Sequence, residues 1–228
     1  ARSAALKEFV LSITPKHLVS RLEDAPHLIQ VDVSGDGVCL VVHARNVAQF
    51  MHHYLPETGA LQLGFFRYNI GRLCDEHNFH HVGSMLGDTL FLLANLFKND
   101  HPSALAAMKA CLGLASKIEA PPTEGYALEI CCGAAAGRLV GMPLGVFCVR
   151  YDVFGPAMQE AHSLALECPK GTTVNVSPAM KTALSNQSPL PMTPPLRSPS
   201  MRGLHSNSPS MGDDSIATEH PSEAGSGH

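Results

Sequence analysis

The hydrophobic positions of the chain alternate between helical and strand spacing up to about residue 184. Apolar residues that return every three or four positions predict helices, and short apolar runs between turn residues predict strands. The predicted helices cover 6–22 with a kink at Pro15, about 58–77, 102–119, a segment opened by Gly155-Pro156 and a segment capped by Ser177. The predicted strands cover 38–43, 79–86, 89–94, 126–132, 144–149 and 172–176.

From residue 38 to residue 132 the predicted order is strand, helix, strand, strand, helix, strand. This order is typical of the split βαβ, or ferredoxin-like, arrangement, in which an antiparallel sheet carries its helices on one face. Ser34–Gly37 is turn-prone and precedes the first strand, and Gly87-Asp88 predicts a hairpin between the second strand and the third. We therefore predict an α+β fold, an α/β sandwich with a βαββαβ core.

The composition changes at residue 185. From Ser185 to His228 there are 44 residues, of which 21 are Ser, Pro or Gly and none is Phe, Trp or Tyr. Such a segment cannot bury enough apolar surface to offset the entropy lost on ordering it. We predict a segment at 1–24 that serves as a linker or dimerising helix, a folded domain at 25–184 and a disordered tail at 185–228.

The whole chain has 228 residues, of which 45% are hydrophobic and 16% charged, and its formal net charge is -4. This balance excludes a wholly disordered chain and gives no electrostatic reason to expect a nucleic acid or an anionic membrane as partner. No run of 18 apolar residues occurs, so the sequence predicts no membrane span. The chain begins at Ala1 with no initiator Met and no secretory signal, and we interpret it as a piece of a longer protein.

The cysteines favour a reducing environment. There are 7, an odd number, they show no CxxC spacing, and most lie inside apolar runs. This pattern predicts buried, reduced thiols in a cytoplasmic protein, or in the cytosolic part of a membrane-bound parent, in place of a disulfide framework or a zinc site. Cys131 and Cys132 are expected to face opposite sides of a sheet, and a redox switch is the alternative.

Two patterns that imitate metal sites fail on their spacing. Asp32–Gly37 resembles the start of a calcium loop, but the twelfth position is His43 where a bidentate Glu is needed. His77, His80 and His81 are accompanied by no cysteine, and a junction between a helix and a strand commonly carries polar residues. We interpret neither pattern as a metal site.

Five segments match one family in order and spacing. Val10–Leu22 is similar to its "LLxxxLPxHVAxxL" segment, Val38–Ala44 to its first strand and Ser84–Asp88 to its "K/E-x-I-G-D" hairpin. Tyr151–Gly155 is similar to its "Y-D-x-W/F-G" motif, and Thr173–Ser177 to its "I-x-V-S" strand. Together they resemble the catalytic domain of class III nucleotidyl cyclases, the adenylyl and guanylyl cyclase family. The resemblance covers about residues 5–184 and implies a cyclase fold that lacks the family's final strand hairpin.

The resemblance implies a reaction and a metal requirement. Family members cyclise ATP or GTP by attack of the ribose 3′-oxygen on the α-phosphorus, which expels pyrophosphate, at a site between two catalytic domains. Two Asp residues hold the two ions, Mg2+ or Mn2+, that stabilise the attacking and leaving oxygens. The resemblance places the first Asp position on Ala44, which has no oxygen to offer, and the second on Asp88. It therefore implies at best one weak metal site.

The other functional positions are altered as well. The resemblance places the two base-contacting positions on Ser84 and Asp152, of which Asp152 is of the adenylyl type. Gln159 falls where the family has the Asn that orients the ribose, and Ser163 where it has the Arg that steadies the transferring phosphate. A neutral hydroxyl cannot replace a guanidinium fork. The Lys that the family carries on its final hairpin has no counterpart, so we assign no catalytic residue.

These changes lead to the hypothesis of a catalytically impaired cyclase-homology domain in cyclic nucleotide signalling. It would act as the regulatory or structural half of a homo- or heterodimer with a second cyclase catalytic domain, without independent activity. One alternative is an active cyclase with atypical residues, whose missing carboxylate would come from Asp32, Asp36 or Glu57. The other is a non-enzymatic ferredoxin-like interaction module. Binding of ATP or GTP with a divalent metal separates the impaired cyclase from the module.

Overall fold

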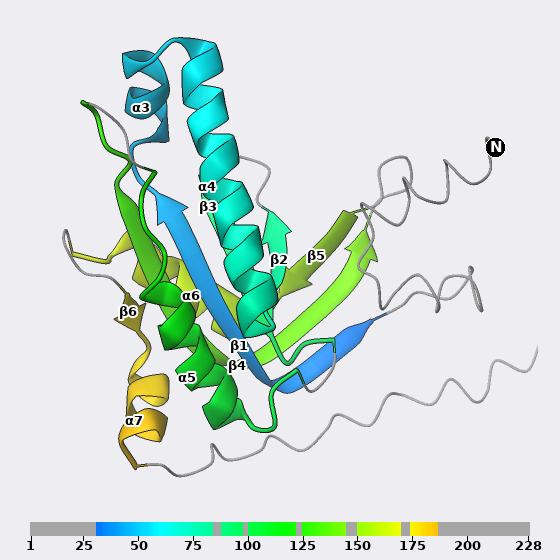
Figure 1. Ribbon diagram of the computed structural model, residues 1–228. Coiled ribbons are helices and arrows are strands. Elements are labelled where there is room, and N and C mark those ends of the chain that lie inside the picture. The colour runs from blue at the N-terminus through cyan, green and yellow to red at the C-terminus, as the bar shows by residue number, and fades with distance from the viewer. Residues whose placement is uncertain are drawn as a thin grey trace, which may run out of the picture. The chain divides into compact units, whose positions relative to one another are not determined.

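The computed structural model describes residues 31–83, 88–97, 100–121, 125–144, 150–169 and 174–186. In this part of the chain one six-stranded sheet has the order β2-β3-β1-β4-β5, with β6 paired to β4 (Figure 1). The strands are β1 (Asp32–Ala44), β2 (His80–Gly83), β3 (Thr89–Ala94), β4 (Ile130–Leu144), β5 (Arg150–Phe154) and β6 (Asn175–Val176). The helices are α3 (Val47–His53), α4 (Pro56–His77), α5 (Ala104–Ala115), α6 (Pro156–Leu166) and α7 (Pro178–Asn186).

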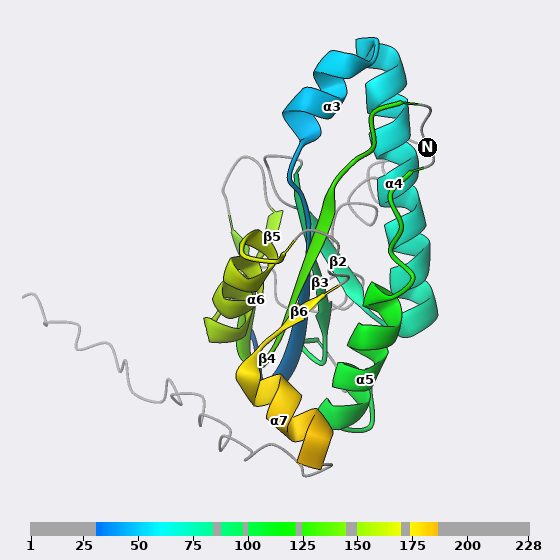
Figure 2. The ribbon, with the colours of Figure 1, turned by 90° about the vertical axis from the view of Figure 1, so that its left-hand side faces the viewer.

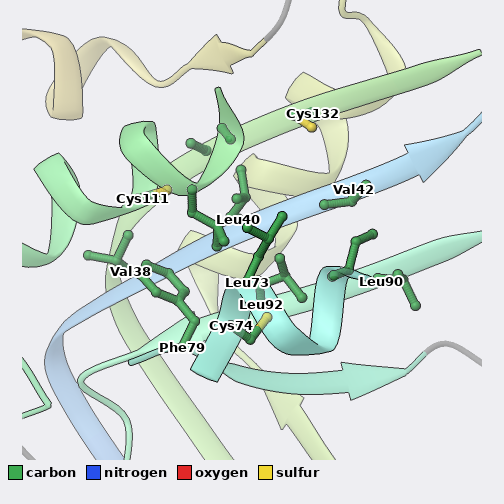
Figure 3. Close-up of a cluster of buried hydrophobic side chains, with 14 of the residues drawn as sticks. Val38, Leu40, Val42, Leu73, Cys74, Phe79, Leu90, Leu92, Cys111 and Cys132 are labelled. Carbon is green, nitrogen blue, oxygen red and sulfur yellow. The ribbon is translucent and has the colours of Figure 1, made fainter. Parts of the chain in front are cut away.

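Helices cover both faces of the sheet. The crossover helices α4 and α5 pack with α7 on one face, and α6 packs on the other (Figure 2). β1 is buried on both sides because its side chains alternate: Val38, Leu40 and Val42 face α4 and α5 (Figure 3), and Cys39 and Val41 face α6. The predicted α+β fold and βαββαβ core are confirmed, with both crossover helices on one face as expected.

The turn predicted at Ser34–Gly37 is wrong. These residues lie inside β1, where the register with β4 shifts between Ser34 and Gly37 as a bulge. The side chain of Ser34 accepts a hydrogen bond from the backbone nitrogen of Asp36 at 3.2 Å, which serves the backbone locally where the ladder is interrupted. Turn-forming residues therefore mark an irregularity within the strand and not its beginning.

The strand predicted at 126–132 begins later and continues further than expected, and all but the first residue of the strand predicted at 144–149 lies outside the described residues. A single strand, β4, begins at Ile130 and continues to Leu144 through a run of Gly and Ala, and β5 begins at Arg150. A Cβ atom on Gly133 would lie 2.1 Å from the carbonyl oxygen of Ala161 and 2.4 Å from the nitrogen of Ala165. The backbone of α6 thus lies directly on β4, and only small residues permit this contact.

The predicted helices are confirmed with changes at their ends. α4 matches the expected segment and buries Phe66, Ile70, Leu73 and Cys74. α5 begins two residues later than predicted, because its first turn is capped by Ser103, whose side chain accepts a hydrogen bond from the backbone nitrogen of Ala106 at 3.1 Å, and it ends at Ala115, before the predicted residue 119. Both Pro-initiated helices α6 and α7 form, and the short α3 was not predicted.

Several predictions fall outside the described residues. They include the N-terminal helix at 6–22, the hairpin residues 84–87 and the tail from 187. The domain boundaries at 24 and 184 therefore stay predictions. No strand hairpin follows β6 among the residues described, which end with α7. None of the described helices combines the length and the apolar character that crossing a membrane requires.

The thiols follow the prediction. The described cysteines are all buried: Cys39, Cys74, Cys111, Cys131, Cys132 and Cys168. Burial raises the pKa of the Cys74 thiol and of the Cys132 thiol to about 12. These thiols are therefore protonated and unreactive at neutral pH, which argues against a redox switch at Cys132.

Candidate functional site

The two positions that the resemblance assigns to metal binding lie side by side. Ala44 ends β1, and its backbone nitrogen donates a hydrogen bond to the carbonyl oxygen of Asp88 at 2.8 Å. The antiparallel register, which pairs His43 with Thr89, holds this end of β1 against the start of β3. The sheet thus brings residues 44 and 88 together although 43 residues separate them in the sequence.

The side chain that β1 presents to Asp88 belongs to His43 and not to Ala44. Ala44 is 6% exposed and packs in the core under α4 and α5, on the face with Val42. His43 points the other way, and its Nδ1 lies 3.1 Å from the hydroxyl oxygen of Thr89. That hydroxyl donates to Oδ1 of Asp88 at 3.0 Å. The hydroxyl of Thr89 has one proton, which it donates to Asp88. Nδ1 of His43 must therefore donate to the hydroxyl oxygen of Thr89, and Nε2 of His43 carries the lone pair.

Burial lowers the pKa of His43 below its ordinary value of 6.5. The nearby charge of Asp88 raises this pKa, while His162 and Arg45 lower it further. His162 comes from α6 and Arg45 follows the end of β1, so two elements contribute to one cluster. The imidazole of His43 is therefore neutral at pH 7, and the one formal negative charge in this cluster is that of Asp88.

Arg45 is held by the end of α6. Its Nη2 donates to the carbonyl oxygen of Leu166 at 3.0 Å and also to that of Cys168. These bonds serve carbonyl groups that a helix leaves without a partner at its C-terminus. The guanidinium therefore joins the end of β1 to the end of α6 and fixes the helix beside His43.

The second group of predicted residues lies on β5 and α6. Asp152 is half-buried on β5, opposite Met142 of β4. Gln159 and Ser163 are exposed and one turn apart on α6. Gly155 directs the chain from β5 into α6 with a φ of 137°, and a Cβ atom there would lie 2.4 Å from the carbonyl oxygen of Arg138. Ser84, the other predicted base-contacting residue, lies outside the described residues.

Asp88 and Asp152 adjoin opposite ends of β1. Asp88 lies beside its last residue, whereas β5 is joined through Gly141 of β4 to its first residue, Asp32. A strand rises about 3.3 Å per residue, so these ends are tens of ångströms apart. Asp32 itself is buried and accepts a hydrogen bond from the hydroxyl of Tyr151 at 2.6 Å. Asp32 therefore cannot supply a second carboxylate beside Asp88.

The described residues do not fit a pair of Mg2+ ions. Magnesium prefers oxygen ligands, and the ligands at this end of β1 are one carboxylate and one imidazole nitrogen. Across the described ranges no three His, Cys, Asp or Glu side chains are grouped in a way that could hold a metal ion. Mg2+ or Mn2+ binding by this chain stays a prediction.

Sequence reasoning missed four members of this cluster: Arg45, Thr89, His162 and the role of His43. One signal was available for His43. Val38 to Ala44 alternates buried positions on two faces, and in a strand residues 43 and 44 must point to opposite sides. His162 and Arg45 gave no such signal, because only the packing of α6 brings them to β1.

Comparison with known proteins bears on the fold. No family model and no curated protein matches the sequence. The structure is similar to the non-canonical dimeric guanylyl cyclase domain of the RhoGC fusion protein from the aquatic fungus Blastocladiella emersonii, with 12% identity, a TM-score of 0.57 and coverage of 70% of this chain and 88% of that chain. It is also similar to the adenylyl cyclase CyaB from P. aeruginosa, with 13% identity, a TM-score of 0.55 and coverage of 70% and 83%.

A third similar structure is the guanylate cyclase domain of RhGC from Catenaria anguillulae, determined in complex with GTP. The identity is 12% and the TM-score is 0.54. The match covers 67% of this chain and 82% of that chain. Identities this low establish the fold alone. The chain has the fold of the catalytic domains of class III adenylyl and guanylyl cyclases.

Proposed function

We propose that this cyclase-like domain has lost independent catalysis and serves as the regulatory or structural half of a cyclase dimer in cyclic nucleotide signalling. The observation that carries the proposal is the side chain beside Asp88. At the end of β1 it is the neutral imidazole of His43, and the alanine next to it is buried in the core. One carboxylate is thus left where the reaction of the resembled family needs two.

In the resembled family, the groups that this chain lacks stabilise the negative charge of the transition state. Two metal ions stabilise the attacking and leaving oxygens of a phosphoryl transfer, and an Arg on the phosphate adds a further contact. Losing one such contact costs about 3–4 kcal/mol, or a factor of 10²–10³ in rate. Here the resemblance assigns the Arg position to Ser163, which is exposed on α6 and cannot carry charge. Two losses of this size reduce turnover below a useful level.

The positions of Asp88 and Asp152 support a two-domain arrangement. Because they adjoin opposite ends of β1, one nucleotide cannot contact both within one chain. A head-to-tail partner would place its own metal carboxylates near Asp152. Among the similar structures one guanylyl cyclase domain is a non-canonical dimer in one crystal structure and monomeric in another, and two further cyclase structures contain GTP or ATPαS. We infer that the partner is a second cyclase catalytic domain, which would hold the Mg2+ or Mn2+ and share ATP or GTP with this chain.

Nucleotide binding distinguishes this function from a pure interaction module. The experiment is calorimetric titration of the chain, mixed with a metal-competent cyclase domain, with a non-hydrolysable ATP or GTP analogue and Mn2+. We expect Asp152→Ala to weaken binding at the shared site at least tenfold and Asp36→Ala, a control on the bulge of β1, to leave it unchanged. Equal binding by both variants would favour the module.

A further inference from the structure

Helix α4 carries a second apolar face that nothing described covers. Its inner face is buried against the sheet, as a surface helix requires. On its outer face Leu61, Phe65 and Tyr68 are 62%, 57% and 70% exposed. Their spacing of four and three residues places them in one stripe along the helix. A contiguous exposed stripe of large apolar side chains marks an interaction surface.

A glycine lies within this stripe. Gly64 is exposed in the middle of the helix, and a Cβ atom added to it would find no atom within 4 Å. Glycine weakens a helix relative to alanine, and no close contact inside the described domain accounts for it. A glycine between Leu61 and Phe65 lets a second helix approach α4 closely, with the large side chains on either side of the contact.

We infer that this face binds the N-terminal segment of the same chain, residues 2–14, as a helix parallel to α4. That segment precedes the predicted kink at Pro15, and its apolar residues Leu6, Val10 and Ile13 have the same spacing of four and three as the stripe. Placed over Leu61, Phe65 and Tyr68 in order, they bury both stripes.

The charges agree with this register. With Leu6 over Leu61, Arg2 lies opposite Glu57 in the first turn of α4. Within residues 2–14 there are two basic residues, Arg2 and Lys7, and one Glu, whereas α4 contains three acidic residues and two Arg residues. The basic segment therefore faces a helix of opposite net charge.

The connection is long enough and sets the direction. α4 ends just before β2 begins. In the sheet His80 of β2 pairs with Leu93 of β3, and Leu93 pairs with Cys39 of β1, so the C-terminal end of α4 lies near the middle of β1. The start of β1 at Asp32 therefore lies beyond the C-terminal end of α4. A parallel helix ends on that side, and residues 15–31 can span up to about 50 Å. Because the segment is tethered, its effective concentration is in the millimolar range, which favours it over a second copy at micromolar concentration.

Cross-linking of the full chain tests this inference. We expect the double variant Val10→Cys/Phe65→Cys to be joined within one chain by a short bismaleimide. The control Val10→Cys/Leu166→Cys, whose Leu166 is 48% exposed on α6, should not be joined. Cross-links between two chains would assign the face to a second copy, and a yield no higher than the control would overturn the inference.

Hydrogen exchange gives an independent measurement. We expect the amides of residues 5–14 to be protected in the full chain, and Phe65→Asp to accelerate their exchange at least tenfold. Leu166→Asp, a matched exposed position on another helix, should leave their exchange unchanged. Both variants alter exposed residues, so folding is retained. Equal exchange in the wild type and the Phe65→Asp variant would overturn the inference.

Discussion

His43 and Asp88 are joined through one hydroxyl group. Nδ1 of His43 lies 3.1 Å from the hydroxyl oxygen of Thr89, which donates to Oδ1 of Asp88 at 3.0 Å. The end of β1 therefore presents an imidazole to Asp88, while Ala44 faces the core. One carboxylate therefore lies at this end of β1, where the resemblance implies two.

Restoring a carboxylate at this end of β1 should restore metal binding, and only at position 43. We expect His43→Asp to tighten Mn2+ binding at least tenfold in calorimetry, because two carboxylates would then face one ion. The matched variant Ala44→Asp would bury a charge among apolar side chains and destabilise the domain by about 3 kcal/mol. Tighter Mn2+ binding by Ala44→Asp alone would show that residue 44 is the metal position.

Acid should destabilise the domain through His43. Its pKa is lowered in the folded state, mainly by burial, so the unfolded chain takes up a proton first as the pH falls. The free energy of unfolding therefore decreases as the pH falls through about 6.5 and recovers above it. His43→Gln should make this decrease smaller between pH 8 and pH 5.5 in urea unfolding. An unchanged pH profile in the variant would contradict this assignment.

A methyl group at Gly133 should push α6 off the sheet. It would lie 2.1 Å from the carbonyl oxygen of Ala161, and backbone cannot yield as a flexible side chain can. We expect Gly133→Ala to lower the free energy of unfolding by about 3 kcal/mol. Gly71→Ala, in open space on α4, should raise it by about 0.5–1 kcal/mol. Denaturant unfolding of both variants measures this difference, and equal stabilities would refute the close contact.

The hydroxyl of Tyr151 should stabilise the attachment of β5. It donates to the buried carboxylate of Asp32 at 2.6 Å and so joins the strand that carries Asp152 to the start of β1. We expect Tyr151→Phe to destabilise the domain by about 1.5–3 kcal/mol. Tyr68→Phe, at a 70% exposed tyrosine, should change stability by less than about 0.5 kcal/mol. A similarly small effect at Tyr151 would contradict this role.

The sequence was sufficient to predict those helices and strands that the spacing of their own hydrophobic residues identifies. α4 follows from its helical spacing, and the antiparallel pair β2 and β3 follows from two short apolar runs in succession. β4 could not be predicted, because its Gly and Ala residues are poor strand formers and are explained only by the contact of Gly133 with α6. Strand propensity depends only on the residues of the strand itself, whereas the small residues of β4 are required by the helix α6 that packs on it.

The candidate site was predicted in part for a related reason. The proximity of residues 44 and 88 follows from the predicted strand and hairpin. The side chain that faces Asp88 depends on the register of a single residue, and in a strand such a shift moves every side chain to the other face. His162 reaches this site from α6, more than 100 residues after His43, and only the folded structure shows that.

The most direct test of the central claim is the formation of cyclic AMP and cyclic GMP by the purified chain. The assay supplies ATP or GTP with Mn2+, and the Asp88→Ala variant serves as the matched control. The account predicts no turnover above this control, because one carboxylate beside a neutral imidazole does not assemble the two-metal site. Turnover clearly above the control would contradict it and would show that the domain is an active cyclase with atypical residues.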